Sequence, residues 1–354
     1  MLDLPKRYVP NGSSASGGFG SVIYCQDEHL ERPVAIKFIK EDSEKHRLMD
    51  ELNALMLLRS KHVVQVYDIV KGESDSIGIV EEYIDGDDLL NSPIPQSSYE
   101  YYLKTLWQIA SGIADMHEVD VIHRDIKPNN MKFDKEGIVK IFDFGLSRDE
   151  GAKAVTKGFK GTFGFAAPEL VKSGFVAFSR AVDTYAFGAT AIALSGMGLP
   201  DELQKIPPQP LLVNFMSTLP FELTPDLASV ITACLAPNPN DRPLMNHVRD
   251  LLSRHLLHNK HQALAVYNNQ PSVLNASKRV VSLKFDNIGE IKIEYDGFRF
   301  FVSLVNGEVL INNEVVLAGK EIPKSCVVAL GGSHRRANMR KFITFDVSNP
   351  EVVL

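Results

Sequence analysis

Two acidic residues and an asparagine stand next to predicted strands in the middle of the sequence. Asp125 and Asn130 lie in the segment HRDIKPNN, which follows the apolar pair Val121-Ile122, and Asp143 comes at the end of a later predicted strand. Carboxylate and amide oxygens are ligands that Mg²⁺ prefers, and they leave positions for water and phosphate oxygens. A further acid beside a hydroxyl can take its proton. The pattern predicts a site for a magnesium-bound phosphate.

A glycine-rich stretch, ASGGFGSV, separates two predicted strands near the N-terminus, and its glycines are Gly17, Gly18 and Gly20. Backbone amides can approach phosphate oxygens closely where side chains are absent. Glycine-rich hairpin turns are also common without a ligand, so this motif alone leaves both interpretations open.

A lysine, Lys37, ends the apolar run Val-Ala-Ile-Lys of a predicted strand. A lysine there is a poor core residue unless an anion meets it. Glu51 lies on the inner side of the helix predicted over residues 43–59, and a Lys37–Glu51 pair would hold the lysine toward a phosphate. An exposed lysine on an edge strand is the alternative when the residue is considered in isolation.

The elements that must position these residues fall into two groups. Residues 7–85 read mainly as short strands around the one helix, and residues 86–258 read mainly as helices, the clearest over 98–118, 181–197, 224–235 and 243–258. Glu169, in the sequence APE, and Arg242 are a carboxylate and a guanidinium that could tie two distant segments together.

The ordered set of motifs over residues 7–258 resembles the eukaryotic-type (Hanks-type) serine/threonine protein kinases. The resemblance implies an α+β, bilobal protein kinase fold over residues 1–258, with lobes of about 1–84 and 85–258. It implies ATP and Mg²⁺ as cofactors and proteins with Ser or Thr acceptors as substrates. The implied catalytic residues are Asp125, Lys127, Lys37 and Glu51, and the implied metal ligands are Asn130 and Asp143. The implied nucleotide-binding residues are Ala15, Gly17, Gly18, Gly20, Val22, Ala35, Lys37, Glu82 and Ile84.

Three positions depart from the family pattern. Ala15 replaces the first glycine of the loop, Glu81 precedes the segment expected to bind adenine where an apolar residue or Thr is usual, and Lys132 falls where an apolar floor is usual. Asp183 matches a buried helix acid whose implied role is structural. None of these changes removes a catalytic group.

The resemblance also implies the acceptor type and a mode of regulation. Lys127 and Thr162 match the Ser/Thr-specific branch of the family. Ser147 and Thr156 lie in the expected activation segment, where a phosphate on Thr156 could reach Arg124, so we expect autophosphorylation there. Two other functions stay open: a pseudokinase that acts as a scaffold, and a small-molecule phosphotransferase of kinase-like fold.

The C-terminal residues alternate between apolar and polar again. We expect a linker over 259–277 and a small all-β domain over 278–354, whose strand rhythm is similar to that of forkhead-associated (FHA) domains, a β-sandwich family. No Gly-Arg turn or Ser-x-x-His precedes Glu294, although Arg335 and Arg336 lie in a basic stretch. This stretch is either a solvated loop or a contact for a phosphopeptide or an intramolecular segment.

Composition limits the remaining choices. The chain has 354 residues, a formal net charge of −6 and three widely separated cysteines. The charge gives no general attraction to nucleic acid or an anionic membrane. The sparse cysteines favour a reducing compartment, so we expect a cytoplasmic protein that binds neither nucleic acid nor membrane.

Overall fold

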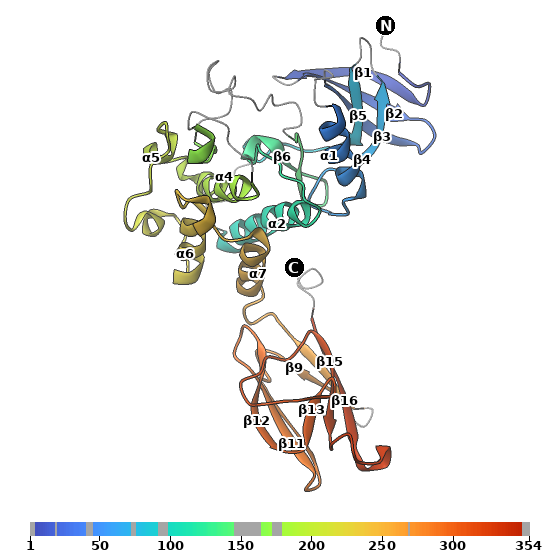
Figure 1. Ribbon diagram of the computed structural model, residues 1–354, viewed down its shortest axis with the longest axis vertical. Coiled ribbons are helices and arrows are strands. Elements are labelled where there is room, and N and C mark those ends of the chain that lie inside the picture. The colour runs from blue at the N-terminus through green and yellow to red at the C-terminus, as the bar shows by residue number, and fades with distance from the viewer. Residues whose placement is uncertain are drawn as a thin grey trace. The chain divides into compact units, whose positions relative to one another are not determined.

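A computed structural model describes residues 4–17, 20–39, 45–71, 76–90, 98–144, 164–171, 179–267 and 270–348 (Figure 1). The chain divides into two compact units, Met1–Asp250 and Leu251–Leu354. Each unit is described by itself.

The first unit begins with a five-stranded antiparallel sheet in the order β1-β2-β3-β5-β4. Its elements are β1 (Tyr8–Gly17), β2 (Gly20–Asp27), β3 (Arg32–Ile39), α1 (Lys45–Leu57), β4 (Val66–Lys71) and β5 (Ile77–Glu82). Residues paired across strands share a face, and faces alternate along each strand. One face carries a buried apolar cluster that includes Ile23, Val34, Ile36 and Val80. The residues between them, on the opposite face, are the ones available to a site.

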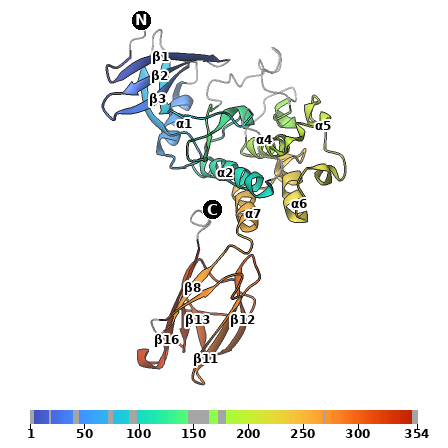
Figure 2. The same cartoon turned by 180° about the vertical axis from the view of Figure 1, so that it is seen from behind.

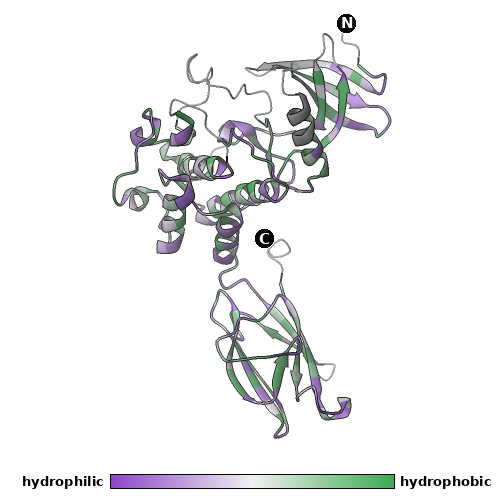
Figure 3. Ribbon diagram, in the orientation of Figure 1, coloured by the Kyte–Doolittle hydropathy of each residue, from purple (hydrophilic) through white to green (hydrophobic). Residues whose placement is uncertain are grey.

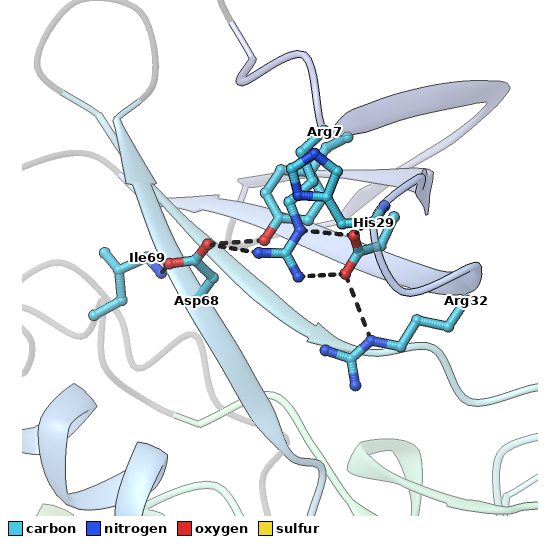
Figure 4. A network of polar contacts seen from close by, with 7 residues as sticks. Arg7, His29, Arg32, Asp68 and Ile69 are labelled. Carbon is cyan, nitrogen blue, oxygen red and sulfur yellow. Dashed lines mark hydrogen bonds and ion pairs between the residues drawn. The ribbon is translucent and has the colours of Figure 1, made fainter.

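A network of polar contacts joins the start of β1 to β2 and β4 (Figure 4). Asp27, at the end of β2, is fully buried and accepts hydrogen bonds from Arg7 at 2.6 and 2.7 Å. The Tyr8 hydroxyl donates to Asp68 of β4 at 2.8 Å, so the first strand is joined to the fourth. Arg7 holds the pKa of Asp27 down at about 2, because its guanidinium stabilises the carboxylate. These contacts tie together segments that are distant along the chain.

The rest of the first unit is mainly helical (Figure 2). Its regular elements are α2 (Tyr99–Glu118), β6 (Met131–Phe133), β7 (Val139–Ile141), α4 (Ala181–Ile192), α5 (Asp201–Gln204), α6 (Pro225–Cys234) and α7 (Met245–Leu256), whose end belongs to the second unit. Ser98 caps α2 by accepting the N–H of Tyr101 at 3.2 Å, as its residue type favours. A five-residue π-helical segment, Ala193–Met197, follows α4 directly.

The second unit contains two sheets around one apolar core. A three-stranded sheet has the order β10-β11-β12, and a six-stranded sheet has the order β14-β13-β15-β16-β8-β9. The strands are β8 (Ala263–Tyr267), β9 (Gln270–Leu274), β10 (Val280–Phe285), β11 (Gly289–Tyr295), β12 (Phe300–Gly307), β13 (Val309–Ile311), β14 (Glu314–Val315), β15 (Ser325–Leu330) and β16 (Lys341–Val347). Alternating residues of both sheets, such as Ile293 and Ile343, fill the core. The connection between β15 and β16 is mostly hydrophilic (Figure 3).

The linker expected over residues 259–277 is wrong where β8 and β9 lie. Strand β8 pairs with β16, the last strand of the chain, through Thr344↔Val266 and Val347↔Ala263. The polar runs at residues 258–262 and 268–270 suggested a linker, but they flank the short apolar strand β8. A partner strand about eighty residues away supplies the hydrogen bonds, and local composition does not reveal it.

None of the helices in the described part of the chain is both long and apolar enough to span a bilayer.

Candidate active site

Three polar side chains meet in the loop before β6. Lys127 Nζ donates to Asp125 Oδ2 at 2.9 Å, and Asn130 Nδ2 donates to the same oxygen at 3.0 Å and to the Asp125 backbone oxygen at 2.8 Å. Lys127 and Asn130 are buried, with 8% and 4% of their surfaces exposed. A carboxylate held by two donors has a fixed orientation, which is what a proton acceptor for a bound hydroxyl needs.

Asp143 follows β7 and meets Lys37 of β3. Their ammonium and carboxylate form an ion pair, so the apolar strand ends on a lysine that is buried against an anion. Strand β7 pairs with β6, and the Phe142 N–H donates to the Asn130 carbonyl at 3.0 Å. This pairing places Asp143 beside the loop of Asp125 and Asn130. The structure thus brings Lys37 and Asp143 next to the loop of Asp125 and Asn130, as the sequence predicted.

Asp183 of α4 is completely buried and holds the loop that leads into Asp125. Its carboxylate accepts the backbone N–H groups of His123 and Arg124, each at 2.8 Å, and His117 Nε2 lies 3.0 Å from Oδ2. Burial raises the pKa of Asp183, but hydrogen bonds from His117 and the loop outweigh it, so the pKa is lowered overall. Asp183 is therefore an anion that fixes the loop.

Two residues of the site have backbone conformations that are uncommon for side chains. Arg124 has φ 68° and Asp143 has φ 66°. Such conformations cost free energy and persist only where surrounding contacts enforce them. Here Asp183 holds Arg124, and Lys37 holds Asp143. These contacts keep both residues in conformations that side chains rarely adopt.

His123 has a defined tautomer. Its Nε2–H donates to the Phe142 carbonyl at 3.0 Å, and its Nδ1 accepts the Asp125 N–H at 3.3 Å. Burial lowers the pKa of His123, which agrees with a neutral ring that donates on one side and accepts on the other. His123 thereby connects the loop of Asp125 to the segment before Asp143. Neither this role nor that of His117 was foreseen, although a histidine on the buried side of the predicted helix 98–118 was a usable signal.

The proposed nucleotide wall lies on the sheet face opposite the apolar cluster. Val22 pairs with Lys37, and Ala35 pairs with Glu81, so these residues share the face of the lysine. Glu82 ends β5, and its carboxylate pairs with Lys140 at 2.9 Å. Its N–H donates to the Gln65 carbonyl at 2.9 Å, while Ile84 follows the strand and is half-buried. This order leaves the segment after β5 next to the Ala35 position.

The glycine-rich stretch forms the end of the β1–β2 hairpin. Ala15 pairs with Val22, and Gly17 pairs with Gly20, at the end of the two strands. Gly18, the phosphoacceptor candidates Ser147 and Thr156, and the branch marker Thr162 lie outside the described residues. Glu51 belongs to α1, but its side chain is not among those described, so the Lys37–Glu51 pair stays a prediction.

The orientation of Asn130 bears on the predicted metal ligands, Asn130 and Asp143. The Asn130 amide nitrogen is used by Asp125, so its oxygen is left as an acceptor. One carboxylate oxygen of Asp143 contacts Lys37, and the other can serve a cation. Among the described residues, no cluster of three or more His, Cys, Asp or Glu side chains could hold a metal. The donor set therefore fits Mg²⁺ that takes its remaining ligands from phosphate and water.

Glu169 and Arg242 form the distant pair expected from the sequence. Arg242 Nη1 lies 2.6 Å from Glu169 Oε1, and Nη2 lies 2.7 Å from Oε2, a two-point ion pair. Arg242 also donates to the backbone oxygens of Ala181 and Ala236. The guanidinium thus links the start of α4 with the segments on both sides of it.

Comparison with known proteins agrees with this geometry. Residues 13–252 match the family model described as the protein kinase domain. The chain belongs to the protein kinase family. The kinase is 30% identical to mitogen-activated protein kinase kinase kinase nsy-1 of Caenorhabditis elegans over 268 aligned residues. The alignment covers 70% of this chain and 17% of the relative.

Two further relatives come from Dictyostelium discoideum. Cyclin-dependent kinase 11 is 34% identical over 211 aligned residues, which are 54% of this chain and 57% of the length of that relative. A probable serine/threonine-protein kinase is 29% identical over 262 residues, 71% of this chain and 42% of its own. The kinase chain therefore spans between 17% and 57% of the length of these three curated relatives.

Proposed function

We propose that this kinase transfers the γ-phosphoryl group of ATP, with Mg²⁺, to serine or threonine hydroxyls of proteins. The observation that carries the proposal is the convergence of Lys37 and Asp143 with the group of Asp125, Lys127 and Asn130. A carboxylate oriented by two donors and a separate ammonium–carboxylate pair are the parts that phosphoryl transfer requires.

The residues divide the work as follows. The hydroxyl oxygen of the substrate forms a bond to the γ-phosphorus while the bond to the β–γ bridging oxygen breaks and ADP leaves. Asp125 orients the hydroxyl and takes its proton. Lys127 and Lys37 stabilise negative charge on the phosphates. Asn130 and Asp143 would hold Mg²⁺, which neutralises phosphate charge when it is bound.

The Ser/Thr preference rests on two supports. Lys127 stands two residues after Asp125, as in the Ser/Thr-specific branch, and one relative is named a probable serine/threonine-protein kinase. We extend the proposal to autophosphorylation at Thr156 or Ser147, both of which lie outside the described residues.

The test is phosphoryl transfer from ATP to a generic basic protein with Mg²⁺. We expect Asp125→Ala and Lys37→Met each to reduce the rate at least about 100-fold, and chelation of Mg²⁺ to abolish it. Asp250→Ala, a change at an exposed acid, is the matched control. Absence of transfer with retained ATP binding would favour a scaffold, and transfer only to small hydroxyl compounds would favour a small-molecule phosphotransferase.

For the C-terminal unit we propose a forkhead-associated-like interaction module. Two sheets around one core support it, as does the one-residue connection at Glu308 between β12 and β13. Arg335 is already held by Glu308 at 2.7 and 2.8 Å, and it holds the pKa of Glu308 down at about 2. Arg336 is exposed and is the better candidate to meet a phosphate or another acidic group.

A titration of the full chain with phosphothreonine peptides tests the module. We expect Arg336→Ala to weaken binding more than Lys324→Ala, an exposed control on the same unit. Equal affinity for phosphorylated and unphosphorylated peptides would contradict a phosphopeptide partner.

A further inference from the structure

Glu81 is an acidic residue on the sheet face that otherwise carries the apolar wall of the site. It lies opposite Ala35 of β3, while Ile79, two residues earlier, lies opposite Lys37. Glu81 and Lys37 are therefore diagonal neighbours on one face. Only 8% of Glu81 is exposed, so its carboxyl group is not a solvated surface charge.

The Glu81 carboxyl group has no hydrogen-bond donor from the described part of the chain. Burial raises the pKa of Glu81 to about 7, with Lys37 lowering it and Asp143 raising it, so the carboxylate is the main form above pH 7. The Lys37 ammonium itself makes its contact with Asp143. An acceptor buried without a donor costs free energy, typically about 1 to 3 kcal/mol and more for a charged group. A side chain of this kind is stabilised when a ligand brings the missing donor.

The neighbours of Glu81 indicate which part of a ligand would reach it. Glu82 and Ile84, immediately after it, are the residues whose backbone we propose to bind adenine, and Ala35 lies directly across the sheet from Glu81. In this orientation the substituent on carbon 6 of a purine points at the Glu82 carbonyl. The same substituent then also lies next to the Glu81 side chain. Adenine carries an amine with two hydrogens there, whereas guanine and hypoxanthine carry an oxygen.

We propose that Glu81 determines base specificity, by accepting one hydrogen of the adenine amine while the Glu82 carbonyl accepts the other. This inference rests on the proposed function. A 6-oxo purine would place its oxygen against a carboxylate and a carbonyl, so two acceptors would face it without a donor. The site thus selects adenine by attraction and rejects guanine by repulsion.

A role of Glu81 that acts only through Lys37 predicts a different pattern. Lys37 is proposed to contact phosphates, which are identical in adenine and hypoxanthine nucleotides. Changing Glu81 would then alter the affinity for both nucleotides by the same factor. Discrimination between the two bases separates the roles, whatever happens to the total affinity.

The experiment measures equilibrium binding of ADP and inosine diphosphate to the full chain with Mg²⁺ at about pH 8.5, where Glu81 is mainly a carboxylate because its pKa is about 7. We expect the wild type to prefer ADP by roughly 10- to 100-fold, the value of one hydrogen bond to a charged group. Glu81→Leu should lower the ratio at least about threefold, because both acceptor and charge are lost, and the preference that remains comes from the Glu82 carbonyl. Glu81→Gln should lower it by a similar factor, since its amide can accept from adenine or donate to hypoxanthine. Asp85→Asn, on a side chain that is 57% exposed, is the control and should keep the wild-type ratio.

A second measurement needs no variant of Glu81. The diphosphate of unsubstituted purine riboside lacks the amine but carries no oxygen, so the wild type should bind it more weakly than ADP and more tightly than inosine diphosphate. Equal affinity for all three nucleotides, or an unchanged ratio in both folded Glu81 variants, overturns the inference alone. Failure of the wild type to bind ADP overturns the proposed function together with it.

Discussion

The Asp183 carboxylate on α4 and the backbone N–H of Arg124 are joined by a hydrogen bond of 2.8 Å. This contact links a buried helix to the residue directly before Asp125, and it holds Arg124 at a positive φ of 68°. The position of Asp125 therefore depends on a side chain 58 residues away that cannot itself touch a substrate. Activity should respond to changes in this support as well as in the site.

Replacing Asp183 by Asn tests the support directly. An amide oxygen can keep one of the two loop N–H groups, but the amide nitrogen would face the other donor. We expect a loss of about 3 kcal/mol in the free energy of unfolding and a fall in kcat for phosphoryl transfer. Denaturant unfolding and steady-state rates measure both. A variant as active and stable as the control Asp241→Asn, at an exposed acid, would contradict the prediction.

Asn130→Asp tests the orientation of the catalytic carboxylate. The new carboxylate cannot donate to Asp125 Oδ2, now at 3.0 Å from the amide nitrogen, and the two anions would repel each other. We expect kcat to fall at least about tenfold, and by no more than the roughly 100- to 10,000-fold that a general base contributes. Asn129→Asp changes the exposed neighbour and should keep the rate. Equal rates for the two variants would show that the contact is dispensable.

The Glu169–Arg242 pair should be a large contributor to stability of the helical part. Removing Arg242 leaves the Glu169 carboxylate, whose side chain is 15% exposed, without its partner, so Arg242→Ala should cost about 3 to 5 kcal/mol. A double-mutant cycle with Glu169→Gln should show strong coupling. The Arg180–Asp120 pair is exposed on both sides, and the same cycle there should give less than about 1 kcal/mol. Similar coupling in both cycles would refute the distinction.

His62 should make the kinase sensitive to acid. Burial, with a smaller effect from Lys61, lowers the pKa of His62 to about 4, below the ordinary value near 6.5 in the unfolded chain. Between these values the unfolded state binds more protons, so the free energy of unfolding falls as pH falls. The loss from pH 7 to pH 5 should be about 2 kcal/mol.

The variant His62→Gln checks the origin of this loss. It should flatten the pH dependence of unfolding, while His29→Gln, at an exposed histidine, should keep the wild-type slope. His123 also has a lowered pKa and adds a loss of the same sign, so some slope should remain. Parallel stability curves for the wild type and His62→Gln would rule out His62 as the source.

Most of the candidate site could be predicted because its residues come in short motifs. The loop from His123 to Asn130 makes its key contacts over separations of two to five residues, as in the Lys127–Asp125 and Asn130–Asp125 hydrogen bonds. Such contacts depend on local spacing, so a linear sequence contains them. The Glu169–Arg242 pair spans 73 residues, and it was predicted from the complementary charges of the two side chains rather than from local spacing.

Other features could not be predicted because they depend on strand pairing between distant segments. The pairing of β8 with β16 turned an expected linker into a sheet, and the polar runs on both sides of the five-residue β8 gave no sign of it. The role of His117 depends on the approach of α4 to the end of α2. In each case the partner, rather than the residue itself, decides the outcome.

The amino-acid sequence by itself indicated the family, the order of the elements in the first unit and the groups that we propose to do the chemistry, since these follow from residue type and spacing. Only the tertiary structure decided that Lys37 meets Asp143, that Glu81 is buried beside them without a donor, and that Asp183 holds the loop of Asp125. The physical reason is that charge, burial and strain are set by what lies across a sheet or beneath a loop, and those neighbours are far away along the chain.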